Sequence, residues 1–384
     1  MLERSITGEK SNIKSRTWLE TQDIDLGFKI YDNASTTLYS GLAGIALFYN
    51  YLWRVSLNIE YKNVASEIIE SIIENIPKEH DSKIYNKVKS GAFNGIGGIL
   101  YVLFYLDHSN NTNIYEDDIL NIFDILFNSI NKSKANDIIN KTGNLGIMIS
   151  IYEKSRNEKF RNIALDIAKM IFEDLNKTKI VIDKYPGICW SEEGFTGYSH
   201  GNSGIIAQLY RLYNITKNKA ILDLIDEALL FERSMFSSED NKWFKSIKDK
   251  NTTCGWCHGE AGILLSKIQL KKLGYQDSLI DDEIYTAIEN IKKNGLKNDI
   301  SLCHGAFGNM SILKDAAILL DNIDLYNESV ATIDLLVDFI LSLIKTELFK
   351  EKEYNGFMVG LSGIAYELLR LEREDEIPNI LGLE

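Results

Sequence analysis

Two Cys-His pairs are the residues of this sequence best suited to binding a metal. Cys257-His258 in CGWCHGEAG and Cys303-His304 in LCHGAFG stand at the same place before a glycine, in successive copies of a repeat. The two cysteines should therefore face each other across neighbouring loops, with one of the histidines as a third ligand. Two thiolates and one imidazole suit Zn²⁺ and leave its fourth tetrahedral position open for a substrate. Buried cysteines and loop histidines without a metal are the alternative.

Cys254 forms a Cys-x-x-Cys motif with Cys257, which raises two other interpretations. A zinc ribbon would need a second such pair, and the sequence has none. A thioredoxin-like redox motif would need a βαβ setting, which the helical pattern of this chain does not provide. Four cysteines in a chain of this size, without a secretory signal, also argue against a disulfide framework.

His200, in GYSHGNSG, stands before its glycine where the two Cys-His pairs carry their histidines, but without a cysteine beside it. A neutral imidazole there could act as a general base or acid, because its unperturbed pKa lies near the working pH. A histidine that only caps its own loop is an equal alternative. His80 and His108 lie away from the glycines and are predicted in surface loops, and Cys189 is predicted in the core or at its rim without a role.

These motifs belong to a repeat that runs through the chain. A Gly-x-x-Gly unit occurs seven times, each copy is followed by an apolar stretch, and the first glycines are 46 to 58 residues apart. One copy alone would carry no weight, since helices often begin after glycine. Seven copies at similar spacing indicate a repeated helical unit. The first glycines are Gly41, Gly95, Gly143, Gly201, Gly259, Gly305 and Gly360.

Amphipathic stretches between the glycine units predict a second helix in each repeat. In residues 63–76, Val64, Ile68 and Ile72 share one helical face, while glutamates lie elsewhere. Comparable helices are predicted at 118–130, around 163–171, and at 219–236, 281–293 and 329–345. The pattern predicts an all-α fold of seven helical-hairpin repeats, with glycine-led helices inside and amphipathic helices outside. Periodicity alone leaves an open solenoid as the rival arrangement.

Charge and hydropathy exclude some classes of protein. A net charge of -13 argues against nucleic-acid binding, which needs a clustered basic surface. The beginning of the sequence has no apolar stretch of the length that a signal peptide requires, and no run of about 18 apolar residues follows. We therefore expect a cytoplasmic protein with no membrane-spanning segment and no nucleic-acid partner.

The sequence resembles the lanthionine synthetase C (LanC-like) family, the cyclases of lanthipeptide biosynthesis and their relatives. GWCHG and LCHG match the two zinc motifs of the family, and SHGNSGI matches its histidine motif. The resemblance extends through all seven glycine units. It implies a closed α/α toroid, or barrel, with two nested layers of seven helices, forming one domain over residues 1–384.

The same resemblance implies roles for five residues. Cys257, Cys303 and His304 would bind Zn²⁺, the expected cofactor. His200 would be the acid/base residue. His258 would stand next to the metal, where it could orient the substrate or assist proton transfer.

Two positions depart from the family pattern. Ile139 stands where members often have an aspartate, four residues before the glycine of the third repeat, and Asp137 is the nearest carboxylate that could replace it as a catalytic residue. That replacement would require a two-residue shift in the loop. Thr253 stands where members have an arginine, four residues before the first zinc cysteine.

The resemblance also implies a reaction and its partners. The enzyme would be a zinc-dependent lanthionine synthetase that adds a cysteine thiol of a dehydrated precursor peptide, with leader and core, to a dehydroalanine or dehydrobutyrine in the same peptide. A separate dehydratase would act first, since no such domain is present in the sequence. An exporter is a further candidate partner, and membrane association would arise only through such a biosynthetic complex.

Three other functions remain open at this point. A relative of the same family could add glutathione or another free thiol to a dehydrated protein. A zinc prenyltransferase also activates a thiol in a helical toroid, but the seven glycine units fit it poorly. A zinc-stabilised peptide-binding scaffold without catalysis is the third, and the departures at Ile139 and Thr253 keep it open.

Overall fold

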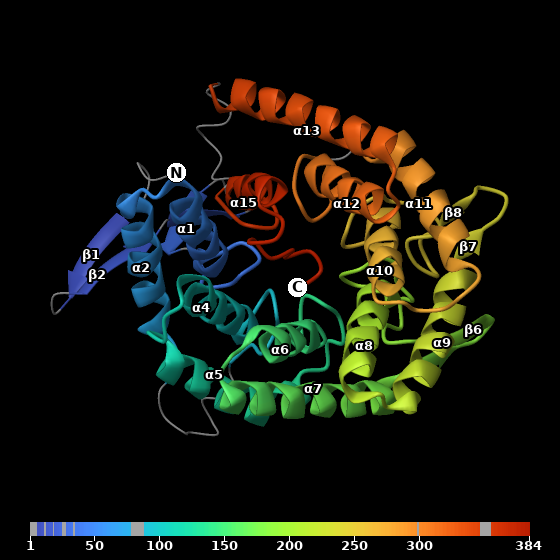
Figure 1. The fold of residues 1–384 in the computed structure, drawn as a ribbon, viewed down its shortest axis with the longest axis horizontal. Coiled ribbons are helices and arrows are strands. Elements are labelled where there is room, and N and C mark those ends of the chain that lie inside the picture. The colour runs from blue at the N-terminus through green and yellow to red at the C-terminus, as the bar shows by residue number, and fades with distance from the viewer. Residues whose placement is uncertain are drawn as a thin grey trace. The chain divides into compact units, whose positions relative to one another are not determined.

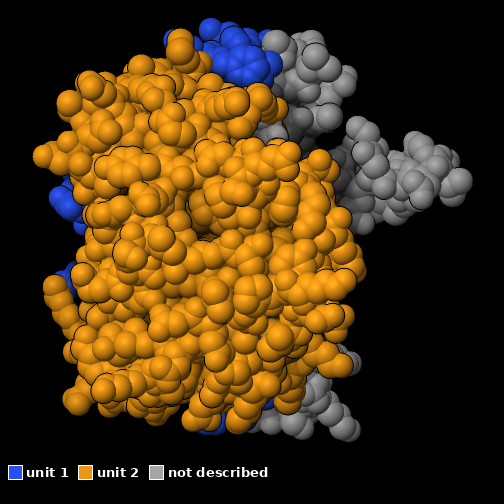
Figure 2. All heavy atoms as spheres, turned by 90° about the vertical axis from the view of Figure 1, so that its right-hand side faces the viewer, with its two compact units in different colours: residues 1–89, 93–129, 338–378 blue, residues 90–92, 130–337, 379–384 orange. Residues whose placement is uncertain are grey.

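The computed structural model describes residues 6–10, 13–17, 19–24, 28–33, 35–77, 88–297, 299–345 and 355–384. Within these residues the chain forms thirteen α-helices and four two-stranded antiparallel sheets (Figure 1). The chain divides into two compact units, which Figure 2 distinguishes by colour. Unit 1 comprises residues 1–89, 93–129 and 338–378, and unit 2 comprises 90–92, 130–337 and 379–384. The interpretation as one domain stays a prediction.

A mostly buried helix begins at each of the seven glycine units, as the repeat predicts. The first glycine is the N-cap residue of six of these helices, and Gly143 is the first residue of the seventh. The second glycine lets a neighbouring loop come close: a Cβ added at Gly262 would lie 2.3 Å from the backbone nitrogen of Tyr198. The helices are α1 (Leu42–Ser56), α4 (Ile96–Asn110), α6 (Gly143–Lys154), α8 (Asn202–Thr216), α10 (Glu260–Lys272), α12 (Ala306–Leu319) and α15 (Leu361–Glu372).

All six predicted amphipathic stretches form helices. They are α2 (Ile59–Ile73), α5 (Glu116–Ser129), α7 (Glu158–Thr178), α9 (Lys219–Ser234), α11 (Ile280–Asn294) and α13 (Ile323–Ile344). Three of them begin at an asparagine whose side chain accepts a hydrogen bond from a backbone amide in the first turn: Asn58, Asn157 and Asn218. In unit 2, α7, α9 and α11 lie outside α6, α8 and α10 (Figure 1).

The described strands are short and pair only with their neighbours in the sequence. Before α1 lie β1 (Ile6–Lys10) with β2 (Ile13–Thr17), and β3 (Leu19–Ile24) with β4 (Phe28–Asn33). The described residues ahead of α1 therefore form hairpins and no outer helix. Two further hairpins are insertions of unit 2, β5 (Ile180–Ile182) with β6 (Tyr185–Cys189) and β7 (Phe236–Ser237) with β8 (Lys242–Trp243).

Backbone hydrogen bonds join neighbouring loops at one repeated position, two residues before the first glycine of a unit. In unit 1, the amide of Tyr39 donates to the carbonyl of Phe93 (3.0 Å), and the amide of Met358 donates to that of Tyr39 (2.7 Å). In unit 2, the amide of Cys257 donates to the carbonyl of Cys303 (3.1 Å). Equivalent residues of successive repeats thus lie side by side within each unit.

Residues 379–384 form a buried part of unit 2 that supports the loops leading to the inner helices. The indole Nε1 of Trp256 donates to the carbonyl of Leu381 (3.0 Å), and Gln208 Nε2 donates to that of Gly382 (2.9 Å). Because Trp256 precedes Cys257, this segment anchors the loop that carries the first cysteine. In the described part of the chain, no helix combines the length and apolarity needed to span a bilayer.

Candidate metal centre and histidine pair

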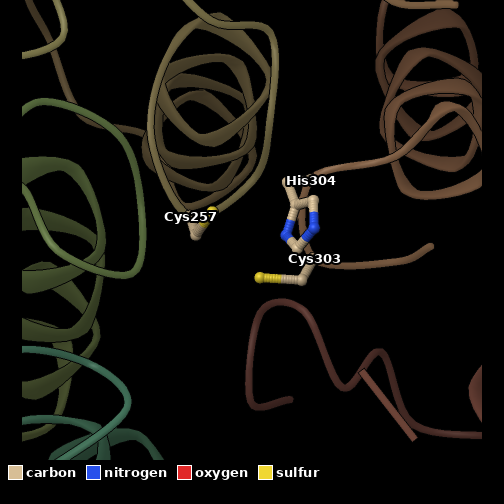
Figure 3. Close-up of side chains that lie close together, drawn as sticks. All are labelled: Cys257, Cys303 and His304. Carbon is tan, nitrogen blue, oxygen red and sulfur yellow. The ribbon is translucent and has the colours of Figure 1, made fainter. Parts of the chain in front are cut away.

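Cys257, Cys303 and His304 lie together in unit 2, at the ends of the loops before α10 and α12 (Figure 3). One potential ligand atom from each residue lies within 4.8 Å of the others. In a tetrahedral zinc site with Zn–S bonds near 2.3 Å, two sulfurs would be about 3.7 Å apart, so a small contraction would suffice. The donor set of two thiols and one imidazole also fits zinc, and the three residues leave a fourth position open.

Glycines bring the two loops together. Gly259 has φ of +103°, and a Cβ there would lie 1.7 Å from the carbonyl oxygen of Thr253, so a side chain at this position is excluded. Gly255 lies against His304, where an added Cβ would come within 3.0 Å of that residue's Cα and Cβ. The sequence CGWCHG therefore combines the cysteine with the two glycines that let its loop fold against the next one.

The cluster has the electrostatics of a cation site. Hydrogen bonding from Cys303 lowers the pKa of the Cys257 thiol to about 4, and His304 contributes in the same direction. The contact with Cys257 raises the pKa of His304, and the carboxylate of Asp299 adds to this. A stabilised thiolate beside a protonated imidazole is the arrangement in which a divalent cation would displace the protons.

Asp299 contacts His304 on its other side. Its Oδ2 lies 2.7 Å from His304 Nε2, and its Oδ1 accepts a hydrogen bond from the amide of Ser301 (2.7 Å). The carbonyl of Asp299 also accepts from the amide of Ala306, the first residue of α12 (2.7 Å). Hydrogen bonds within its own loop therefore hold the carboxylate in place, in addition to its contact with the histidine.

His200 and Asp137 form a second pair near the cluster. His200 Nδ1 lies 3.1 Å from Asp137 Oδ2, and the amide of His200 donates to the carbonyl of Cys257 (3.3 Å). Asp137 is oriented by Asn140, whose backbone amide and side-chain amide both donate to its Oδ1 (2.9 and 2.8 Å). The structure thus brings Asp137 to His200, while Ile139 is buried in the core.

His258 follows Cys257 in the sequence and contacts the His200–Asp137 pair. Its ring stacks on that of His200, with centroids 4.5 Å apart and planes 20° apart, and Phe195 packs against it at 4.9 Å. Burial, together with the nearby charge of His200, lowers the pKa of His258 to about 4. The ring is therefore neutral at physiological pH, and within the described structure its buried Nδ1 has no hydrogen-bond partner.

The remaining cysteines and histidines lie outside this constellation. Cys254 is buried with its sulfur 3.5 Å from Glu260 Oε2, and Cys189 is buried with its sulfur 3.3 Å from the carbonyl of Ser191. The predicted surface loop at His108 is wrong in one respect: the side chain is exposed, but the residue lies in the last turn of α4 and stacks on Phe104. His80 lies outside the described residues.

Thr253 has a structural place in the loop. Its carbonyl accepts the hydrogen bond of the Glu260 amide (3.2 Å), and its hydroxyl donates to the carbonyl of His258. The residue thus connects the beginning of α10 to the histidine that precedes it.

Asp299 and Phe195 were not predicted as site residues, although their positions in the repeat carry a signal. Both stand six residues before the first glycine of their repeats, as do Asp137 and Thr253. All four contact a histidine of the site in the structure. An alignment of the repeats against one another would have selected these positions.

The fold and the site together define an all-helical repeat protein with a candidate Cys₂His metal centre. Comparison with solved structures finds the same fold in a protein named nisin cyclase, with a TM-score of 0.70, 18% sequence identity and 92% of each chain covered. This similarity confirms the predicted all-α class and the α/α toroid as its type.

A sequence profile described as Lanthionine synthetase C-like protein matches residues 32–382. The chain belongs to this family. A characterised relative, "Glutathione S-transferase LANCL1" from Danio rerio, is 24% identical over 297 residues, which cover 74% of this chain and 71% of that protein.

Proposed function

We propose that this protein is a zinc-dependent lanthionine synthetase that closes thioether rings in a dehydrated precursor peptide. The observation that carries the proposal is the convergence of Cys257, Cys303 and His304 next to the stacked histidines His200 and His258. Membership of the family and the fold shared with nisin cyclase support it. A separate dehydratase would supply the substrate in the cytoplasm, and an exporter is a further predicted partner.

The three clustered residues are the proposed zinc ligands. Cys257 and Cys303 would bind as thiolates and His304 as a neutral imidazole, which leaves one position for the thiol of the substrate. When bound, zinc would lower the pKa of that thiol, so that a thiolate forms near neutral pH.

His200 is the proposed acid/base residue, with Asp137 as the residue that positions it. A carboxylate at 3.1 Å favours a proton on Nδ1, which leaves Nε2 free to exchange a proton with the substrate. The neutral ring of His258 stacks against His200 and would restrict the orientation of both the catalytic imidazole and the substrate.

The reaction is an addition without a leaving group. The thiol sulfur forms a bond to the β-carbon of the dehydroamino acid while the carbon–carbon π bond breaks. The electron pair of that bond moves toward the α-carbon and its carbonyl group. The thiol loses one proton, and the α-carbon gains one. His200 would take the first proton and donate the second, so it would end the cycle unchanged.

A second candidate function uses the same site with a different thiol. The Danio rerio relative is named a glutathione S-transferase, which favours the addition of glutathione to a dehydrated protein or peptide. The two reactions are distinguished by mass: ring closure leaves the mass of the peptide unchanged, whereas addition raises it by one molecule of glutathione. A zinc-stabilised scaffold would do neither.

The test combines metal analysis with an assay on a dehydrated, cysteine-containing peptide, with and without glutathione. Wild type should contain one zinc and should render the peptide thiol resistant to alkylation at unchanged mass. Cys303→Ala should lose zinc and activity, while Cys189→Ala, a control that removes a buried thiol outside the cluster, should keep both. A zinc-free wild type would contradict the metal assignment, and a zinc-bound but inactive wild type would favour the scaffold.

A further inference from the structure

Asp299 is a carboxylate that contacts a residue of the proposed Cys₂His centre at hydrogen-bond distance. Its Oδ2 lies 2.7 Å from His304 Nε2. This contact engages Nε2 of His304, so Nδ1 is the ring nitrogen that would bind a metal. Histidine ligands of metal sites commonly donate their second N–H to such a carboxylate, which fixes the tautomer and the orientation of the ring.

We propose that Asp299 is a positioning residue for the metal centre: it holds His304 in the tautomer that carries its proton on Nε2, so that His304 binds zinc through Nδ1. This inference rests on the proposed function, since it assumes that the three clustered residues bind zinc. It adds an assignment of the ligating atom and a fourth residue on which zinc affinity depends.

The loop around Asp299 is organised in a way that favours this role. Oδ1 accepts the amide of Ser301, and the backbone carbonyl accepts the amide of Ala306 at the beginning of α12. These two bonds fix the carboxylate independently of the histidine, so its orientation exists before a metal arrives. Gly305 makes this possible, because a Cβ there would lie 2.3 Å from Asp299 Oδ1.

The asparagine variant separates positioning from a purely structural role. Asp299→Asn keeps an oxygen that can accept the amide of Ser301, but it places an NH₂ group opposite His304 Nε2. That donor favours Nε2 as an acceptor and moves the ring proton to Nδ1, where it competes with zinc. A residue that only held the loop would tolerate this change.

Asp137→Asn is the matched control. Asp137 makes the corresponding contact to a histidine, but its partner His200 is not one of the proposed ligands. The same chemical change should therefore leave zinc affinity unaltered.

The experiment measures zinc affinity by competition with a chromophoric chelator at pH 7.5, for wild type, Asp299→Asn and Asp137→Asn. We expect Asp299→Asn to bind zinc about 10- to 100-fold more weakly than wild type and Asp137→Asn to bind as wild type does. Circular dichroism of the metal-free proteins compares their folding. In parallel, nitrogen NMR of histidine-labelled, zinc-loaded wild type should show His304 protonated on Nε2, with the resonance assigned by its loss in His304→Ala.

Each outcome bears on a separate claim. Wild type that binds no zinc would overturn the proposed metal centre itself. Zinc-bound wild type with His304 protonated on Nδ1, or an unchanged affinity in Asp299→Asn, would overturn the role of Asp299 alone. If Asp299→Asn folds poorly, the tautomer observed in wild type decides the question.

Discussion

Replacing Glu260 with glutamine should remove a pH dependence from the stability of the protein. Glu260 is the first residue of α10, directly after the glycine of the Cys257 loop, and it is 1% exposed. Burial raises its pKa from 4.5 to about 7, against the lowering effect of its hydrogen bond with Cys254. The neutral carboxyl is therefore the form that the folded chain favours.

The sign and size follow from this shift. Below the unfolded-state pKa the carboxyl is protonated in both states and contributes nothing. Between about pH 4.5 and 7 the unfolded chain releases the proton while the folded chain retains it, so the free energy of unfolding falls as pH rises. At about 1.4 kcal/mol per pKa unit, the loss approaches about 3 kcal/mol above pH 7. Glutamine has no proton to release, so the variant does not lose this stability as pH rises.

Urea unfolding of the metal-free proteins, followed by circular dichroism at several values between pH 5 and 8, measures this effect. The stability of Glu260→Gln relative to wild type should rise by about 2.5 kcal/mol between pH 5 and 8. Glu192→Gln, at an exposed glutamate in the loop after β6, controls for the loss of one carboxylate. Parallel curves for wild type and Glu260→Gln would refute the reasoning.

Three further changes test the site and its support. Asp137→Asn should slow ring closure about 100-fold or more in single-turnover assays, because the acid/base histidine loses the group that fixes its tautomer. Lys267→Met should lower the free energy of unfolding by about 3 kcal/mol in urea, because Glu232, 1% exposed and 2.7 Å from Lys267 Nζ, would stay buried without its cation. Gly259→Ala should reduce the zinc retained after gel filtration, because its φ of +103° and the carbonyl of Thr253 leave no room for a methyl group. A wild-type rate of ring closure, free energy of unfolding or zinc content in the respective variant would contradict the corresponding expectation.

The repeated helices could be predicted from the sequence because their signals are local. A glycine before each apolar stretch marks where an inner helix begins, and a spacing of three and four between apolar residues marks an outer one. Val64, Ile68 and Ile72 are buried along α2 as that spacing requires. The hairpins β5–β6 and β7–β8 could not be predicted in this way, because strands of two to five residues carry too few positions to show an alternation.

Residues at the candidate site were predictable to the extent that they carry unusual side chains. Cysteine beside histidine is conspicuous, so Cys257 and Cys303 could be selected by type and spacing. Aspartate is common on the surface, so the residue type does not distinguish Asp299, and only its position six residues before Gly305 could have selected it. The roles of these residues remain predictions until they are measured.

The site is best understood as three positions of one repeated loop. Two residues before the glycine, backbone hydrogen bonding sets equivalent residues of successive repeats side by side, which brings Cys257 to Cys303. One residue before the first glycine, three successive repeats carry histidine. Six residues before the first glycine, the loop lies against these histidines, and the third and sixth repeats carry aspartate at that position. A repeated loop thus acquires an asymmetric site by substitution at fixed positions. The two aspartates contact different histidines, so one would support proton transfer while the other would support metal binding.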